Sequence, residues 1–399
     1  MINLDKFLAK NPKVQYFPEF DPWGEHNGVS FKGIKALAYE GADFMGKKTK
    51  VFAHIGYPEN MDKKVPAMVL IHGGGGHPED QWIKKWNERG YAAIAMDTTG
   101  FFPTKPIPYL YEGYTEGLER ELVAPFYEEG YTVAPNNSGL ADSEDPIENQ
   151  WMYHALAQVI LAHNILRSDE RIDSDNIGVT GISWGGIISS ILIGYDLRYK
   201  FAIPIYGSGY LSEGLSGICT SLFTPPMVEK WLAEKNFSKV NIPVMWLCWN
   251  ADPCFSVNSN SKSYLATKNS NKNTCLSMLN KMGHSHAEGF RPEENHYFAD
   301  RIVNGLNIPE VKAEYKENKV YYSAEEKLKS VKAYYLNEKL NYKLMNKNGD
   351  VNTHMTEEWK VIELDHTKNE AVLPENILGR YLEFAFENGI VLTSPYVEM

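Results

Sequence analysis

The chain has 399 residues, 43% of them hydrophobic, and carries a formal net charge of −11 at pH 7. This length allows a large buried core and more than one domain. The acidic excess argues against binding to nucleic acid or to an anionic membrane surface. The four cysteines are few, no apolar run is long enough to span a membrane, and charges interrupt the first ten residues before a signal peptide could form. We therefore expect a soluble cytoplasmic protein.

The first half of the chain predicts a sheet that changes from antiparallel to parallel pairing. Strands are expected at residues 34–39 and 49–56, where they would form an antiparallel edge. From Val65 the pattern becomes strand, helix, strand, with a buried strand at 65–71, a helix at 81–89 and a strand at 91–97.

A glycine-rich loop follows the strand at 65–71, where His72 precedes four consecutive glycines at 73–76. Such a loop can lend a backbone N–H to an oxyanion hole, and losing one donor of this kind costs on the order of 3 kcal/mol of transition-state stabilisation. Gly74 and Gly75 are the candidate donors. A flexible turn or a phosphate loop is the alternative, but no Gly-Lys-Ser/Thr follows.

Residues 98–150 interrupt the alternation of strands and helices. They are rich in proline, glycine and aromatic residues, which predicts a lid-like insertion over a binding site or, equally, a segment packed on the N-terminal region. A helix is predicted next, at 151–167. Its histidines, His154 and His163, follow no strand, so we interpret them as packing or surface residues.

The pattern Gly-x-Ser-x-Gly at 181–185 comes directly after the β-branched run 177–180 and before an apolar helix. This context predicts a nucleophile elbow, a sharp strand-to-helix turn that exposes Ser183, with glycines where a Cβ would clash. A chance occurrence of the pattern is the alternative.

A second irregular stretch, 206–232, follows the strand predicted at 201–205 and should line a pocket at the same sheet edge.

Asp252 and His284 each lie just beyond an apolar run, at 242–249 and at 274–279. Serine, acid and histidine in this chain order, each after a strand, predict a triad in which Ser183 attacks, His284 transfers the proton and Asp252 orients the imidazole. Asp252 could instead be only a turn residue before Pro253.

His286 is the alternative base, because it lies two residues beyond His284 in the same loop. We favour His284, since Gly283 and Ser285 on either side suit a tight turn after the last strand. The two histidines could also form a metal half-site with Glu288, but no further Cys or His lies nearby to complete it. We therefore expect no metal and no cofactor.

The composition changes after residue 308. Partial period-two alternation, as at 311–315, 331–335 and 381–386, predicts a small antiparallel β-sandwich over 309–399. We expect a catalytic domain over 1–308 and an accessory, stabilising domain after it. The predicted fold class is α/β, a doubly wound, mostly parallel sheet with an appended sandwich.

Four segments resemble bacterial α/β-hydrolases of the acetyl xylan esterase, dienelactone hydrolase and prolyl oligopeptidase group. These are residues 72–76, 86–97, 181–186 and 282–286, and the resemblance spans about 34–303. It implies an α/β-hydrolase fold with Ser183 as nucleophile, Asp252 as acid and His284 as base. It also implies an oxyanion hole built from the Trp184 N–H together with Gly74 or Gly75.

The resemblance implies a serine ester hydrolase that removes a small acyl group, most plausibly acetyl, from a sugar or related alcohol. A peptidase of the prolyl oligopeptidase type is the alternative enzyme, although those usually carry a large N-terminal propeller and fewer than 70 residues precede the first core strand here. A catalytically idle hydrolase fold that binds a ligand is the third reading. The partner is a small-molecule or carbohydrate ester, and a homo-oligomer remains open.

Overall fold

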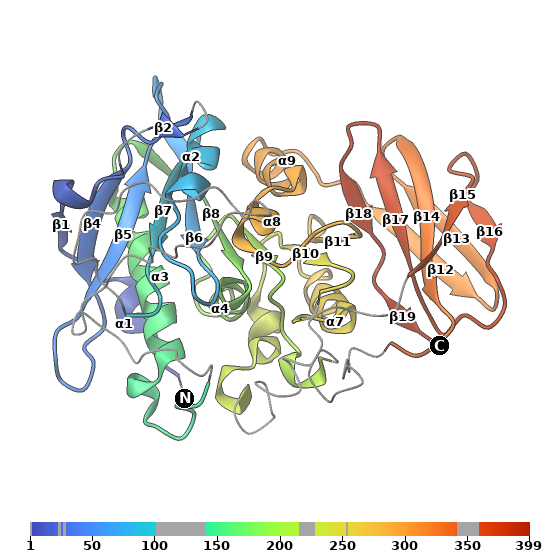
Figure 1. Ribbon diagram of the computed structural model, residues 1–399, viewed down its shortest axis with the longest axis horizontal. Coiled ribbons are helices and arrows are strands. Elements are labelled where there is room, and N and C mark those ends of the chain that lie inside the picture. Colours follow the sequence, from blue (N-terminus) through green and yellow to red (C-terminus); the bar gives the residue numbers. More distant parts are fainter. Residues whose placement is uncertain are drawn as a thin grey trace.

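The computed structural model describes residues 2–22, 25–26, 29–100, 140–214, 228–252, 254–340 and 359–399. A large sheet flanked by helices occupies one side of the molecule, and smaller antiparallel sheets occupy the other (Figure 1). Residues 101–139 of the predicted insertion and 215–227 of the second irregular stretch lie outside the described residues, as do Pro253 and Cys219.

The large sheet has nine strands. In spatial order they are β1 (Val14–Tyr16), β4 (Lys35–Glu40), β5 (Lys50–Gly56), β7 (Ala92–Met96), β6 (Val65–Ile71), β8 (Ile172–Ile182), β9 (Phe201–Ile205), β10 (Met245–Trp249) and β11 (Cys275–Leu279). Pairing is antiparallel from β1 to β7 and parallel from β7 to β11. The predicted antiparallel edge and parallel centre are confirmed. A separate ribbon pairs β2 (Glu25–His26) with β3 (Val29–Ser30).

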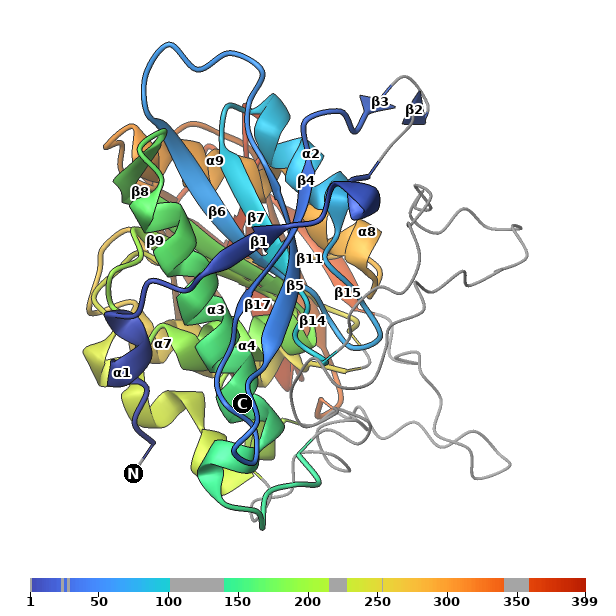
Figure 2. The ribbon, with the colours of Figure 1, turned by 90° about the vertical axis from the view of Figure 1, so that its left-hand side faces the viewer.

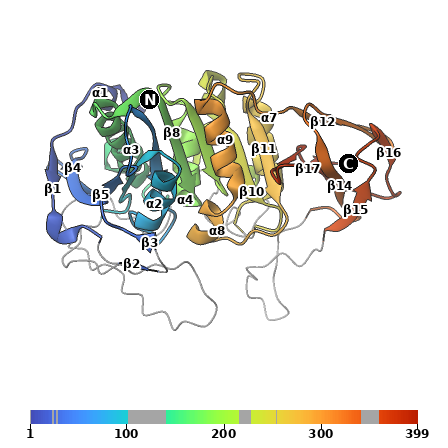
Figure 3. The ribbon, with the colours of Figure 1, turned by 90° about the horizontal axis from the view of Figure 1, so that it is seen from above.

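Helices cover both faces of this sheet (Figures 2 and 3). One face carries α2 (Asp80–Glu88), α8 (His286–Phe290) and α9 (Glu293–Val303); the other carries α1 (Asp5–Leu8), α3 (Trp151–Ser168), α4 (Trp184–Leu192) and α7 (Val257–Thr267). Short 3₁₀ turns are η1 (Pro18–Phe20), η2 (Ile147–Asn149), η3 (Leu211–Glu213), η4 (Glu229–Trp231) and η5 (Ala233–Lys239). The parallel strands are mainly apolar because helices bury them from both sides, and the exception is the polar, partly exposed first half of β8.

Helix α3 is buried almost all round, which explains why its histidines lie inside the fold. His154 Nε2 lies 2.7 Å from the carbonyl oxygen of Glu148, and His163 Nδ1 lies 2.9 Å from the carboxylate of Asp196. Both histidines are packing residues, as predicted.

Among the described helices, none combines the length and the apolar character needed to cross a membrane. Among the described residues, Cys248, Cys254 and Cys275 form no disulfide.

Two antiparallel sheets form the C-terminal part of the chain. One contains β12 (Val311–Lys316), β13 (Lys319–Ala324) and β16 (Glu370–Val372); the other contains β15 (Lys360–Leu364), β14 (Leu328–Leu336), β17 (Gly379–Phe386), β18 (Val391–Thr393) and β19 (Val397–Glu398). They share an apolar core made by Val320, Tyr322, Val331, Ala333, Leu373, Ile377, Leu382 and Phe384. The three predicted alternating runs are strands β12, β14 and β17, and β18 packs beside β11 at the end of the large sheet (Figure 1).

Candidate active site

Ser183 occupies the sharp turn between β8 and α4, with φ 58° and ψ −115°. A positive φ is strained for a residue with a side chain, and such strain is typical of functional sites. The turn is held at the serine itself, because its N–H donates to the carbonyl of Ile205 at 2.9 Å and its carbonyl accepts from the N–H of Ile187 at 3.0 Å. The serine is therefore presented at the carboxyl end of the parallel sheet.

The glycines on either side of Ser183 are required by close backbone contacts. A Cβ on Gly181 would lie 2.1 Å from the carbonyl oxygen of Gly185, and a Cβ on Gly185 would lie 2.0 Å from the carbonyl oxygen of Ile71. Real Cβ atoms essentially never approach other atoms so closely. The geometry therefore gives both glycines of the Gly-x-Ser-x-Gly pattern a steric reason.

Ser183, His284 and Asp252 form a continuous hydrogen-bonded chain. His284 Nε2 lies 3.0 Å from Ser183 Oγ, and His284 Nδ1 lies 2.8 Å from Asp252 Oδ2. These distances fall within the range expected for a nucleophile and its base and for a base and its orienting acid. The structure thus brings together the three side chains that the sequence placed after separate strands.

Asp252 is fully buried, and its carboxylate is held from the side opposite the histidine. Its Oδ1 accepts backbone N–H groups from Cys254 at 2.7 Å and from Phe255 at 3.0 Å. Oδ2 is then left to accept from His284 Nδ1. This arrangement selects the imidazole tautomer whose Nε2 lone pair faces the serine hydroxyl.

The imidazole of His284 lies between aromatic rings. Its ring centre is 4.6 Å from that of Tyr206 and 6.0 Å from that of Phe255. Burial alone lowers the pKa of His284, but the charge of Asp252 and its hydrogen bond outweigh this and raise the pKa above its usual value. The site therefore stabilises the imidazolium that forms when the histidine takes a proton.

The glycine loop runs beside the nucleophile. A Cβ on Gly73 would lie 3.1 Å from Ser183 Cβ, and one on Gly74 would lie 2.9 Å from the indole of Trp184. Gly73 donates its N–H to His286, and Gly76 donates its N–H to the carbonyl of Gly73. Within the described residues these bonds do not use the N–H groups of Gly74 and Gly75, and both residues are exposed. The loop is thus placed beside the elbow through Gly73 and Gly74, and the donor role of Gly74 or Gly75 stays a prediction.

Trp184, the third predicted donor residue, is the first residue of α4. The N–H groups of a first helical turn have no acceptor within their own helix, and they lie at the positive end of its dipole. The backbone N–H of Trp184 directly follows the nucleophile in the chain. This is the place of an oxyanion-hole donor in a nucleophile elbow.

His286, the alternative base, does not lie on the serine. Its Nε2 accepts the N–H of Gly73 at 2.9 Å, so the proton of the neutral ring must be on Nδ1, which lies 3.4 Å from Glu79 Oε1. Burial lowers the pKa of His286 well below its usual value, and burial raises the pKa of Glu79. His284 is the histidine that reaches Ser183, while His286 joins the base loop to the glycine loop.

His72 holds the glycine loop from its other side. Its Nε2 accepts the N–H of Thr98 at 3.0 Å, and its Nδ1–H donates to the carbonyl of Gly73 at 2.8 Å. Burial lowers the pKa of His72, so this ring is neutral as well. The peptide units around Gly73 are therefore fixed by two histidines, of which His72 is buried and His286 half-buried.

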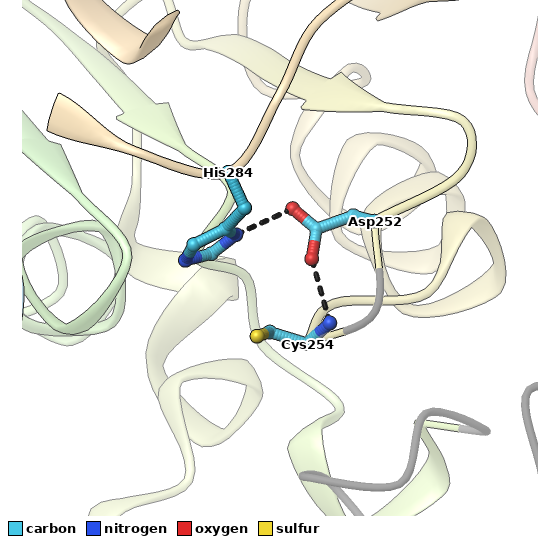
Figure 4. A group of neighbouring side chains, drawn as sticks. All are labelled: Asp252, Cys254 and His284. Atoms are coloured by element: carbon cyan, nitrogen blue, oxygen red, sulfur yellow. Dashed lines mark hydrogen bonds and ion pairs between the residues drawn. The ribbon is translucent and has the colours of Figure 1, made fainter. Parts of the chain in front are cut away.

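Asp252, Cys254 and His284 are the described side chains that come close enough together to share a metal ion, with ligand atoms within 4.8 Å of one another. Figure 4 shows the carboxylate of Asp252 bonded to His284 on one side and to the Cys254 N–H on the other. An ion bound here would compete with the acid–base pair. The alternative half-site of His284, His286 and Glu288 is not such a group among the described residues, and Glu288 pairs instead with Arg291 at 2.7 Å.

Sequence reasoning missed Tyr206 and Glu79. Tyr206 has a positive φ of 60° at the end of β9, and its hydroxyl donates to the carbonyl of Gly283, just before the base. The only available signal was its place directly after the strand at 201–205. Glu79 gave no signal, because its partner His286 is distant in the chain.

The family model for acetyl xylan esterases matches residues 11–213, just over half of the chain. The chain belongs to the acetyl xylan esterase family. The match includes the glycine loop and Ser183 and ends before Asp252 and His284. Family and fold together support a hydrolase of the serine type.

Solved structures of similar fold include other acetyl xylan esterases. The acetyl xylan esterase from Paenibacillus sp. R4 is 16% identical, with a TM-score of 0.52 over 76% of this chain and 92% of that one. Acetyl xylan esterase 1 from Thermoanaerobacterium sp. JW/SL YS485 is also 16% identical, with a TM-score of 0.50 over 75% of this chain and 92% of that one. At this identity the likeness shows the α/β-hydrolase fold.

Curated proteins of similar sequence include dipeptidyl-peptidases. Dipeptidyl-peptidase 5 of Aspergillus oryzae is 28% identical over 186 residues, which are 44% of this chain and 21% of the relative. Probable dipeptidyl-peptidase 5 of Aspergillus terreus is 29% identical over 202 residues, 48% of this chain and 22% of the relative. The matches thus span about a fifth of the length of these relatives.

Proposed function

We propose that this protein is a serine carboxylic ester hydrolase that removes a small acyl group, acetyl above all, from a sugar or a related alcohol. The observation that carries the proposal is the chain of hydrogen bonds from Ser183 through His284 to Asp252, set on a strained elbow beside the glycine loop. Membership of the acetyl xylan esterase family supports the acetyl ester as substrate.

The first half-reaction forms an acyl-enzyme. Ser183 Oγ attacks the ester carbonyl carbon while His284 Nε2 takes the hydroxyl proton. The carbonyl oxygen becomes an oxyanion, which the N–H groups of Trp184 and of Gly74 or Gly75 stabilise. When the C–O bond to the alcohol breaks, His284 returns the proton to the departing alkoxide, and the acyl group remains on Ser183.

The second half-reaction uses the same groups on water. His284 takes a proton from a water molecule, whose oxygen attacks the acyl carbon, and the oxyanion forms again in the same place. His284 then protonates Ser183 Oγ as the acid departs. The net reaction is ester plus water to carboxylic acid plus alcohol. Asp252 stays ionised and stabilises the imidazolium in both halves.

Bulky side chains beside the nucleophile favour a short acyl group. The Trp184 indole packs edge-on against Trp151, with ring centres 5.1 Å apart, and lies against Gly74. Trp151 is itself fixed, because its Nε1 donates to the carbonyl of Thr98 at 2.6 Å. A rigid indole next to the reacting serine supports acetyl over longer chains.

A peptidase is the second candidate, favoured by the dipeptidyl-peptidase 5 relatives. Acyl transfer from an amide needs the same nucleophile, base and oxyanion hole, so the triad alone is compatible with both activities. The two differ in the leaving group and in what the pocket accepts on the acyl side.

Substrate preference tests the proposal. Hydrolysis of p-nitrophenyl acetate, longer p-nitrophenyl esters, acetylated xylo-oligosaccharides and a proline-nitroanilide is compared between wild type and Ser183→Ala. Acetyl release that falls about 10⁴- to 10⁶-fold in the variant is the expected result. Turnover of the nitroanilide but not of the acetates would favour the peptidase, and thermal stabilisation by sugar esters without any turnover would favour a binding protein.

A further inference from the structure

The C-terminal sheets meet the hydrolase sheet through a cluster of aromatic side chains, Tyr334, Trp359, Tyr381 and Tyr396. Tyr334 and Tyr381 stack with ring centres 5.0 Å apart and planes 3° apart. Trp359 packs edge-on against Tyr381 at 5.2 Å and against Tyr396 at 6.1 Å. The tyrosines are almost completely buried. We call this group the aromatic cluster.

Asn250 joins the aromatic cluster to the loop that carries the acid. Trp359 Nε1 donates to the Asn250 carbonyl at 3.0 Å, and Asn250 Nδ2 donates to the Tyr381 hydroxyl at 2.9 Å. Asn250 is fully buried and lies two residues before Asp252. Both its backbone and its side chain are therefore held by residues of the C-terminal sheets.

The same asparagine also reaches the loop that carries the base. Its N–H donates to the carbonyl of Leu279 at 3.0 Å, and its Nδ2 lies 3.4 Å from Asn280 Oδ1. Leu279 ends β11, and the chain then continues to His284. Asn250 thus lies where the acid loop, the base loop and the aromatic cluster meet.

Other contacts attach the C-terminal sheets without touching either catalytic loop. Ser277 Oγ donates to the Val391 carbonyl at 2.8 Å, and the Tyr396 N–H donates to Ser261 Oγ at 2.9 Å. These bonds run to strand β11 and helix α7. The sheets are therefore attached at places away from the catalytic loops as well as through Asn250.

From these contacts we propose that the C-terminal sheets position the acid of the triad. Trp359 and Tyr381 are positioning residues that act through Asn250 on Asp252 and, through it, on His284. The proposal rests on the proposed function and gives the appended sheets a role in catalysis beyond stability. Its physical basis is that a misplacement of about 1 Å in a catalytic group can cost about 10²-fold in rate.

Variants that delete one hydrogen bond each test this role in the full-length protein. Tyr381→Phe removes the hydroxyl and keeps the stacked ring, and Trp359→Phe removes the indole N–H. Tyr322→Phe is the matched control, because Tyr322 is equally buried in the C-terminal core and its hydroxyl donates to the Asp365 carbonyl at 2.9 Å. We expect kcat on p-nitrophenyl acetate to fall about 5- to 20-fold in the first two variants, as for loss of a buried hydrogen bond, with KM within about twofold.

A second readout separates positioning from a loss of folded protein. Titration of Ser183 with a fluorophosphonate gives the fraction of active enzyme, and the rate constant of labelling reports the competence of the triad in that fraction. A purely structural role would lower the fraction in all three variants and leave the rate constant alone. Positioning lowers the rate constant for Tyr381→Phe and Trp359→Phe but not for Tyr322→Phe.

The outcomes also distinguish this proposal from the proposed function. Wild type that neither labels at Ser183 nor hydrolyses any ester refutes both. Wild type that labels normally, with all three variants labelling at its rate, overturns the role of the C-terminal sheets and leaves the esterase proposal standing.

Discussion

Replacing His286 by leucine should slow ester hydrolysis without preventing folding. The substitution replaces the imidazole by an apolar side chain of similar size. It removes Nε2, which accepts the Gly73 N–H at 2.9 Å, and also Nδ1, which lies 3.4 Å from Glu79 Oε1. Gly73 is buried and lies against Ser183. The change therefore acts on the peptide that precedes the proposed oxyanion donors Gly74 and Gly75.

The expected magnitude follows from that one hydrogen bond. A buried donor left without a partner costs about 1–3 kcal/mol. If the loop moves to relieve this cost, the donors at Gly74 and Gly75 leave their places, and loss of a complete donor would cost about 10²- to 10³-fold in kcat. Because 1–3 kcal/mol corresponds to about 5- to 150-fold in rate, we expect kcat to fall within that range. KM should change little, since the loss is felt in the transition state.

His286→Gln provides the conservative comparison. Its Oε1 can reach the position of Nε2 and accept the same N–H, so most of the activity should return. His163→Gln is the matched control, because His163 is likewise a hydrogen-bonded histidine of the interior but lies on α3, fully buried, with Asp196 as its partner. That control should lower the urea midpoint of unfolding and leave the kcat of the folded fraction unchanged.

The assay is steady-state hydrolysis of p-nitrophenyl acetate, corrected for active sites by fluorophosphonate titration. Equal kcat for wild type and a folded His286→Leu protein would refute the reasoning, because the Gly73 contact would then have no part in catalysis. A glutamine variant as slow as the leucine variant would show that the hydrogen-bond acceptor is not what matters.

Three further predictions follow from the site. The raised pKa of His284 should place the acidic limb of the kcat/KM profile above pH 6.5. Asp252→Asn should move this limb to lower pH and lower kcat about 10⁴-fold. A limb that stays in place in the variant contradicts the assignment of Asp252 as the partner of His284. By linkage, this histidine's contribution to stability is complete below its unfolded pKa and is lost as pH rises through the raised folded value. Gly185→Ala should destabilise the protein by about 3 kcal/mol or more in urea unfolding, since its Cβ would meet the Ile71 carbonyl; a wild-type midpoint would refute the contact. Cd²⁺ should inhibit wild type more strongly than Cys254→Ser, because the Cys254 thiol lies beside the acid–base pair of Asp252 and His284, and EDTA should reverse the inhibition. Equal inhibition of the two proteins would exclude the Cys254 thiol as a cadmium ligand.

The strand ends, which place the triad, were the most predictable part of the fold. Apolar runs bounded by polar loops predicted both the first and the last residue of β6 and β9 correctly. The strand expected at 242–249 begins later, at Met245, because Pro243 has no N–H to donate to the ladder and Val244 makes only an isolated bridge. Such errors at the start of a strand did not matter for the site, since the functional residues follow the strand's other end.

The outermost strand of the large sheet, β1, could not be predicted from its residues. β1 is exposed along its whole length and has no apolar alternation to mark it. It is a strand because it pairs with β4, an interaction that depends on the finished sheet. Exposed edge strands therefore carry little signal in one sequence, whereas buried central strands carry a strong one.

The contacts that position the catalytic groups were missed for a related reason. His286 meets Gly73, and Asn250 meets Tyr381, across long separations in the chain, and neither pairing follows a local pattern. A triad can be predicted because each member follows a strand end that is visible in the sequence. The contacts that hold it depend on which loops the fold brings together. If the positioning role of the C-terminal sheets is correct, part of the active site is built by a segment whose own sequence carries no catalytic motif.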